Sequence, residues 1–197
     1  MDSTTTPISA VVLTGGHSSR MGTDKAWLPH PESGESLLLR QLALLRGLNP
    51  ASLLVSARSG QSLPLLPPDI TRVDDDGQSG PMAGIAASLE QIETDYLLVV
   101  AVDLPALSRS PLESMVAQIE TDRGVIARSP HGLEPLVGIY PRSLLPELQS
   151  ALATSQNALQ HWLKQPAISS RFTISPFTDS TEFTNWNSPG QDISNEP

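Results

Sequence analysis

Residues 8–25 read ISAVVLTGGHSSRMGTDK, in which an apolar run passes directly into a glycine-rich loop. A short continuous apolar run predicts a buried strand, with the loop at its carboxyl end. Gly15 and Gly16 have no Cβ and tolerate positive φ, so backbone N–H groups can approach a ligand closely there. Arg20 and Lys25 add positive charge to those amides. The stretch therefore predicts a strand that leads into a polyphosphate site.

The spacing of this loop differs from that of two well-known phosphate loops. Five residues separate Gly16 from Gly22, and Lys25 stands three residues beyond Gly22. The P-loop pattern G-x-x-x-x-G-K-[ST] and the dinucleotide fingerprint G-x-G-x-x-G are therefore both absent from it. The simpler interpretation is a tight strand-to-helix turn without a ligand, but the length and charge of the pattern favour phosphate binding.

Length and composition exclude several classes of protein. With 197 residues, 39% of them hydrophobic, the chain suits one α/β domain with a substantial core. It has no cysteine, which excludes disulfides, thiolate metal sites and a cysteine nucleophile. A formal net charge of -9 opposes broad binding to nucleic acid phosphates. Residues 1–7 lack a basic signal region and the next apolar run is too short for a membrane span, so we expect a cytoplasmic protein.

The first half of the chain alternates between strand and helix patterns. We expect further strands at 53–55, 70–74 and 96–102, and helices at 38–48 and 82–91, with a polar surface excursion at 29–35. This order predicts an α/β fold with a mostly parallel central sheet and helices on both faces. The second half is less regular. It predicts strands at 124–127, 136–140 and 171–175, helices that start near Pro111 and at 144–152 and 158–163, and a frayed tail at 191–197.

Asp103 directly follows the most strongly apolar predicted strand and precedes Leu104 and Pro105, whose ring makes the turn rigid. Parallel sheets bind ligands outside the carboxyl ends of their strands, so this carboxylate and the loop after Leu13 should share one crevice. A Mg²⁺ ion that bridges the carboxylate and phosphate oxygens would balance its charge. The alternative is a cap for the helix near Pro111, which lies too far downstream.

Three consecutive Asp residues, 74–76, precede a second glycine-rich loop with the sequence GQSGPMAG at 77–84. An acidic triplet alone is typical of a solvated turn. Here it leads into a predicted helix, whose N-terminal amides would face the same crevice.

Four motifs in this order resemble a known family. They are L-x-G-G-x-S-x-R-M-G-x-D-K from Leu13, an Asp with G-P-M-A-G at 80–84, Asp103 with a proline two residues on, and N-x-N-S-P at 185–189. Together they resemble nucleotidyltransferases with a Rossmann-like half, most closely the molybdenum cofactor guanylyltransferases. The resemblance implies a Rossmann-like nucleotidyltransferase fold over residues 1–197, with a nucleotide-binding half at about 7–107 and an acceptor-binding half at about 108–190.

The resemblance also implies an activity. Members of this family transfer GMP from GTP to molybdopterin with Mg²⁺ and release pyrophosphate, so GTP and molybdopterin are the expected partners. Other cofactor-assembly proteins or apo-molybdoenzymes are further candidates, whereas nucleic acid and membranes are not expected. A cytidylyltransferase, a sugar-phosphate nucleotidyltransferase and a catalytically silent nucleotide-binding module remain as alternatives. Gly15 and the Gly80-Pro81 pair favour GTP over CTP, because related cytidylyltransferases usually have Ala at the first position and lack the pair.

The roles implied for single residues follow from these motifs. The expected catalytic residues are Arg20, Lys25 and Asp103, and Asp103 is also the expected metal ligand. The expected acceptor-binding residues are Asn185 and Asn187, although an ordinary Asn/Pro turn explains N-x-N-S-P equally well. Within the acidic triplet we choose Asp75, and Ser56 stands where the family often has Asn. The expected nucleotide-binding residues are Leu13, Thr14, Gly15, Gly16, Ser18, Gly22, Lys25, Ser56, Asp75, Gly80, Pro81 and Asp103.

Overall fold

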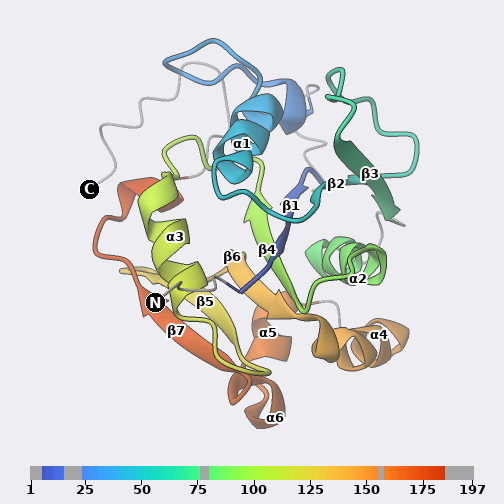
Figure 1. The fold of residues 1–197 in the computed structure, drawn as a ribbon, viewed down its shortest axis with the longest axis vertical. Helices are drawn as coiled ribbons and strands as arrows, with labels where there is room; N and C mark the ends of the chain where they lie inside the picture. Colours follow the sequence, from blue (N-terminus) through green and yellow to red (C-terminus); the bar gives the residue numbers. More distant parts are fainter. Residues whose placement is uncertain (1–5, 16–23, 76–79, 155–157, 185–197) are drawn as a thin grey trace.

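A seven-stranded sheet forms the centre of the molecule in the computed structural model, which describes residues 6–15, 24–75, 80–154 and 158–184 (Figure 1). The strand order is β3-β2-β1-β4-β6-β5-β7. The strands are β1 (Ser9–Leu13), β2 (Leu53–Arg58), β3 (Ile70–Asp75), β4 (Tyr96–Ala101), β5 (Gly124–Ser129), β6 (Gly132–Pro141) and β7 (Phe172–Pro176).

The sheet is mostly parallel, as the alternating pattern predicted. Strands β3, β2, β1 and β4 are parallel neighbours, and β7 is parallel to β5. Only β6 runs antiparallel to its neighbours β4 and β5 among the described strands. The connection between β5 and β6 is a tight turn at 130–131, and two strands joined so closely must be antiparallel.

Helices cover both faces of the sheet, which confirms the second part of that prediction. Alternation along β1 sends Ala10 and Val12 to one face, where α1 (Leu37–Arg46) and α3 (Arg109–Ala117) pack. Val11 and Leu13 point to the other face, which α2 (Pro81–Gln91), α4 (Leu145–Ala153) and α5 (Leu159–Leu163) cover (Figure 1). The short helices are α6 (Pro166–Ser169), η1 (Lys25–Trp27), η2 (Arg142–Leu144) and η3 (Thr181–Phe183).

Several elements differ from the predicted bounds at their ends. Helix α3 begins at Arg109 and includes Pro111 in its first turn, where a missing N–H costs nothing. Strand β6 begins at Gly132 rather than at 136, and α6 was not predicted, because a four-residue helix has no periodic pattern. Among the described residues no helix has the length and apolar character needed to cross a membrane. The predicted frayed tail at 191–197 lies outside the described residues.

Candidate nucleotide site

The carboxyl ends of β1, β2, β3 and β4 meet at one edge of the sheet. The register pairs Leu13 with Ser56 on one side and with Ala101 on the other. Beyond the strand, the Thr14 amide still donates to the carbonyl of Ser56 at 3.0 Å. The loops that follow these strands therefore start side by side, and the described site residues Gly15, Ser56, Asp75 and Asp103 lie along a common edge.

One part of this edge is a close cluster of Ser56, Asp75 and two glycines. Ser56 Oγ donates to Asp75 Oδ2 at 2.9 Å, and Ser56 itself is only 1% exposed. A Cβ on Gly15 would lie 3.7 Å from the same Asp75 oxygen. On Gly84, a Cβ would lie 2.5 Å from Ser56 Oγ and 3.2 Å from Asp75 Oδ2. The cluster therefore joins the ends of three strands to α2, and only glycine fits at position 84.

The structure distinguishes two members of the acidic triplet. Asp74 points away from the cluster and accepts a bond from Arg72 Nε at 2.8 Å, with its side chain 53% exposed. Asp75, the next residue, points to the opposite face of the strand, because successive side chains alternate. Asp75 therefore lies beside Gly15 and Gly84, and its contact with the nucleoside stays a prediction.

The start of α2 lies next to this cluster. Gly80 is its N-cap residue with φ 62°, a conformation that favours glycine, and Pro81 occupies the first turn. The sequence motifs predicted Gly80 and Pro81 as site residues but not Gly84, one turn further along the helix. The signal for Gly84 was present in G-P-M-A-G, because glycine inside a helix has a low propensity and needs a packing reason.

Lys25 and Asp103 form the second part of the site. Lys25 Nζ lies 2.6 Å from Asp103 Oδ2, and both side chains are mostly buried, at 23% and 18% exposed. Lys25 is the first residue of η1, whose N-cap Asp24 accepts from the Ala26 amide at 3.0 Å. Two of the three predicted catalytic side chains are thus in direct contact, although their positions differ by 78 in the sequence.

Two buried polar side chains fix the turn after Asp103. Gln41 Nε2 donates to the Leu104 carbonyl at 2.5 Å. His30 Nε2 lies 3.2 Å from the Pro105 carbonyl, and His30 Nδ1 accepts from the amides of Glu32 and Ser33. Since Nδ1 accepts, Nε2 carries the proton and donates to Pro105. The predicted surface excursion at 29–35 is therefore anchored at His30, which has no sequence pattern that would have revealed it.

Asp103 is not a helix cap, because Ser108 occupies the N-cap position of α3. The described residues contain no group of three or more His, Cys, Asp or Glu side chains that could hold a metal. Mg²⁺ usually binds proteins through one or two carboxylates together with substrate phosphates and water. A single carboxylate at the strand edge therefore fits Mg²⁺ that arrives with a nucleotide.

Six predicted site residues lie outside the described residues, so the structure does not test their placement. They are Gly16, Ser18, Arg20, Gly22, Asn185 and Asn187.

Comparison with known proteins identifies the family. The model of the MobA-like NTP transferase domain matches residues 10–170 of the chain. The chain belongs to this family. The MobA-like NTP transferase is 32% identical over 188 residues to a protein of Synechococcus elongatus named a probable molybdenum cofactor guanylyltransferase, with 92% of this chain and 94% of the relative covered. The resemblance found in the sequence motifs is thereby confirmed.

Solved structures share the fold of this MobA-like NTP transferase. Molybdopterin-guanine dinucleotide biosynthesis protein A of Archaeoglobus fulgidus has a TM-score of 0.65 and 21% identity, over 92% of this chain and 93% of that one. The 2-C-methyl-D-erythritol 4-phosphate cytidylyltransferase of Thermus thermophilus has a TM-score of 0.67 and 16% identity, over 95% and 96%. The nucleotidyltransferase fold is therefore established, and it accommodates enzymes named for different bases.

Proposed function

We propose that this MobA-like NTP transferase transfers GMP from GTP to molybdopterin and forms the guanine dinucleotide of that cofactor. The observation that carries the proposal is the Lys25–Asp103 pair, 2.6 Å apart at the strand edge beside the glycine loop. The similarity to the Synechococcus elongatus relative over nearly the whole chain supports the choice of guanine and of molybdopterin.

The reaction requires alignment and charge neutralisation more than covalent chemistry. A terminal phosphate oxygen of molybdopterin forms a bond to the α-phosphorus of GTP, and the bond from that phosphorus to the oxygen bridging to the β-phosphate breaks. Pyrophosphate then leaves with the bonding electron pair. Lys25 and Arg20, with the loop amides of residues 15–22, would bind the triphosphate whose charge grows toward the leaving group.

Asp103 would hold Mg²⁺, which supplies positive charge to the phosphate oxygens when it is bound. Lys25 Nζ donates to Asp103 Oδ2, so the Lys25 ammonium already orients one oxygen of this carboxylate. The rigid turn held by His30 and Gln41 keeps the carboxylate in place without rearrangement.

Asp75 suits a role at the nucleoside. An ionised carboxylate only accepts hydrogen bonds, so it complements the N–H groups of guanine or the hydroxyls of ribose. Ser56, which replaces the Asn often found in the family, donates to Asp75 and orients it rather than reaching outward. Leu13, Thr14, Gly80 and Pro81 would shape the walls of the same pocket.

The remaining assignments are part of the same proposal. Asn185 and Asn187 would bind the acceptor in the second half of the chain, at about 108–190, while residues 7–107 bind the nucleotide. The enzyme would act in the cytoplasm and exchange its cofactor with other assembly proteins or apo-molybdoenzymes.

Nucleotide-dependent thermal stabilisation tests the proposal directly. With Mg²⁺ present, GTP should raise the melting temperature more than CTP, ATP or UTP, because stabilisation grows with the logarithm of ligand concentration over its dissociation constant. Addition of molybdopterin should then release pyrophosphate from GTP. A larger shift with CTP would instead indicate a cytidylyltransferase, and binding without turnover would indicate a silent nucleotide-binding module.

A further inference from the structure

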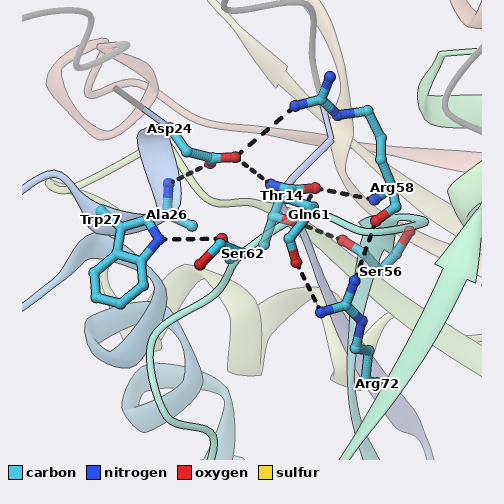
Figure 2. Close-up of polar contacts among 9 residues, drawn as sticks. All are labelled: Thr14, Asp24, Ala26, Trp27, Ser56, Arg58, Gln61, Ser62 and Arg72. Carbon is cyan, nitrogen blue, oxygen red and sulfur yellow. Dashed lines mark hydrogen bonds and ion pairs between the residues drawn. The ribbon is translucent and has the colours of Figure 1, made fainter. Parts of the chain in front are cut away.

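A polar network links the loop after β2 to both sides of the glycine-rich segment (Figure 2). Gln61 lies at the centre of this network. It belongs to none of the sequence motifs, and it is only 9% exposed. Gln61 Oε1 accepts from the Arg58 amide at 2.9 Å, and Gln61 Nε2 donates to Asp24 Oδ2 at 2.6 Å. The Thr14 hydroxyl donates to the Ser56 carbonyl at 2.8 Å and reaches Gln61 Oε1 at 3.4 Å, so one proton is shared between two acceptors.

In the sequence, Thr14 comes directly before residues 15–23 and Asp24 directly after them. Both side chains contact the side-chain amide of Gln61. The two oxygens of Asp24 have different partners, and Oδ2 also lies 3.9 Å from Arg58 Nη2. While Oδ2 accepts from Gln61, Oδ1 accepts from the Ala26 amide and so caps the short helix that begins at Lys25. A chain of contacts therefore runs from Gln61 through Asp24 to Lys25 and Asp103.

Gln61 itself is held on both of its sides. The backbone N–H of Gln61 donates to the Arg58 carbonyl at 2.9 Å across a turn in which Gly60 has φ 75°. Its carbonyl accepts from Arg72 Nη1 at 2.9 Å, and Trp27 Nε1 donates to the carbonyl of the next residue, Ser62, at 3.0 Å (Figure 2). The amide side chain is thus presented by a rigid turn rather than by a free loop.

We propose that Gln61 is a positioning residue for the triphosphate: its amide joins the two sides of the glycine-rich segment and fixes Lys25 through the cap at Asp24. This inference rests on the proposed nucleotide function of the site. It assigns to the loop between β2 and β3 a part in nucleotide binding. Since pre-ordering of a binding side chain such as Lys25 lowers the entropy lost on association, the effect should appear in the affinity for GTP.

A polarity swap provides the sharpest test. Gln61→Glu places a carboxylate against Asp24. Gln61→Glu combined with Asp24→Asn restores both hydrogen bonds of residue 24, because the new Asn amide donates to the new carboxylate and its oxygen still accepts from the Ala26 amide. At pH 8 with Mg²⁺, we expect the single variant to raise the dissociation constant and KM for GTP about tenfold or more, with kcat changed by less than about threefold. The double variant should recover most of the affinity.

Gln149→Glu is a matched control. Gln149 Nε2 donates to Glu90 Oε1 at 2.7 Å on the exposed surface between α4 and α2, so this change creates the same pair of facing carboxylates elsewhere. It should leave GTP affinity unchanged. If the variant Gln61→Glu does not fold, Gln61→Met removes the amide without adding charge, and it too should weaken GTP binding.

The possible results separate this inference from the proposed function. Wild-type GTP binding combined with unchanged affinity in the Gln61 variants would overturn the positioning role alone, as would a loss of kcat at unchanged KM. A double variant that binds GTP no better than Gln61→Glu would also overturn it. If the wild-type protein itself does not bind GTP, the proposed function fails, and the positioning role fails with it.

Discussion

At the scale of single residues, the candidate site depends on two carboxylates that are held by donor groups from other segments of the chain. Asp103 is paired with Lys25, and Asp75 with Ser56. In a chain with net charge -9, a lysine placed against one carboxylate beside a glycine-rich loop is more than a surface pair. Both side chains are mostly buried, so the pair holds two opposite charges in place at the edge where the proposed nucleotide would bind.

The variant Asp103→Asn separates charge from shape. The amide keeps the size and hydrogen-bonding capacity of the side chain but removes the charge that Mg²⁺ and Lys25 require. We expect the transfer rate to fall by about 100-fold or more, with the melting temperature close to that of the wild type. Turnover in a magnesium titration and thermal unfolding measure the two effects.

Asp69→Asn is the control for that experiment. Asp69 pairs with Arg46 at 2.8 Å on the surface, and the Arg46 hydrogen bond holds the pKa of its carboxyl below the ordinary value. The same substitution there should leave transfer unchanged. Wild-type turnover in Asp103→Asn at every magnesium concentration would remove Asp103 from the metal site.

At the scale of elements, helix α2 is packed unusually closely against the strand ends. A Cβ at Gly84 would meet Ser56 Oγ at 2.5 Å and Leu13 Cδ2 at 3.2 Å. Leu13 is buried, and Ser56 is fixed by its bond to Asp75, so neither neighbour moves freely. The close approach of the helix therefore depends on a residue without a side chain, and it sets the position of Asp75.

Gly84→Ala should accordingly destabilise the protein. In an unconstrained helix, alanine would add about 1 kcal/mol of stability, but overpacking in a filled core costs about 1–3 kcal/mol. We expect a net loss of up to about 2 kcal/mol, which corresponds to a fall of up to roughly 8 °C in melting temperature. GTP affinity should fall as well, because Asp75 is displaced.

The double variant Gly84→Ala with Ser56→Ala removes the atom that the new methyl group would contact most closely. It should regain part of the lost melting temperature while GTP binding stays weak. A Gly84→Ala protein that is more stable than the wild type would show that the packing at α2 is looser than described.

At the scale of the whole molecule, local patterns predicted most elements but not their assembly. Apolar runs and helical spacing identified β1, β4, α1 and α2, because these signals lie within one segment. The antiparallel placement of β6 between β4 and β5 depends on pairing between distant segments, which no local pattern specifies. The alternation of strands and helices still predicted the edge where the candidate site lies, because the carboxyl ends of parallel strands meet there.

The same distinction applies to the site. Lys25, Asp75 and Asp103 lie in motifs with recognisable spacing, so the sequence predicted them. Gln61 and His30 lie in loops with no pattern, and their partners are distant in sequence: Gln61 contacts Asp24, and His30 contacts Pro105. Contacts of this kind are visible only in three dimensions.

The segment around η3 gives a prediction for the pH dependence of the whole fold. Ser108 Oγ donates to Glu182 Oε1 at 2.7 Å, while Glu182 Oε2 is buried without a hydrogen-bond partner among the described residues. The next residue, Phe183, packs edge-on against Phe177 with ring centres 4.9 Å apart. Burial, opposed in part by the Ser108 bond, raises the pKa of the Glu182 carboxyl above its ordinary value near 4.5.

A pKa raised in the folded state means that folding favours the protonated form, so the contribution of Glu182 to stability is complete below about pH 4.5 and is lost as pH rises through the folded value. Glu182→Gln, which imitates the neutral form, should therefore raise the melting temperature at pH 7 and give little change at pH 4. Thermal unfolding from pH 4 to pH 8 measures the difference. Glu113→Gln, at an exposed carboxylate paired with Arg109 on α3, should show no such gain at pH 7. A Glu182→Gln protein that is less stable than the wild type at pH 7 would mean that the charged carboxylate stabilises the fold, in contradiction to its burial.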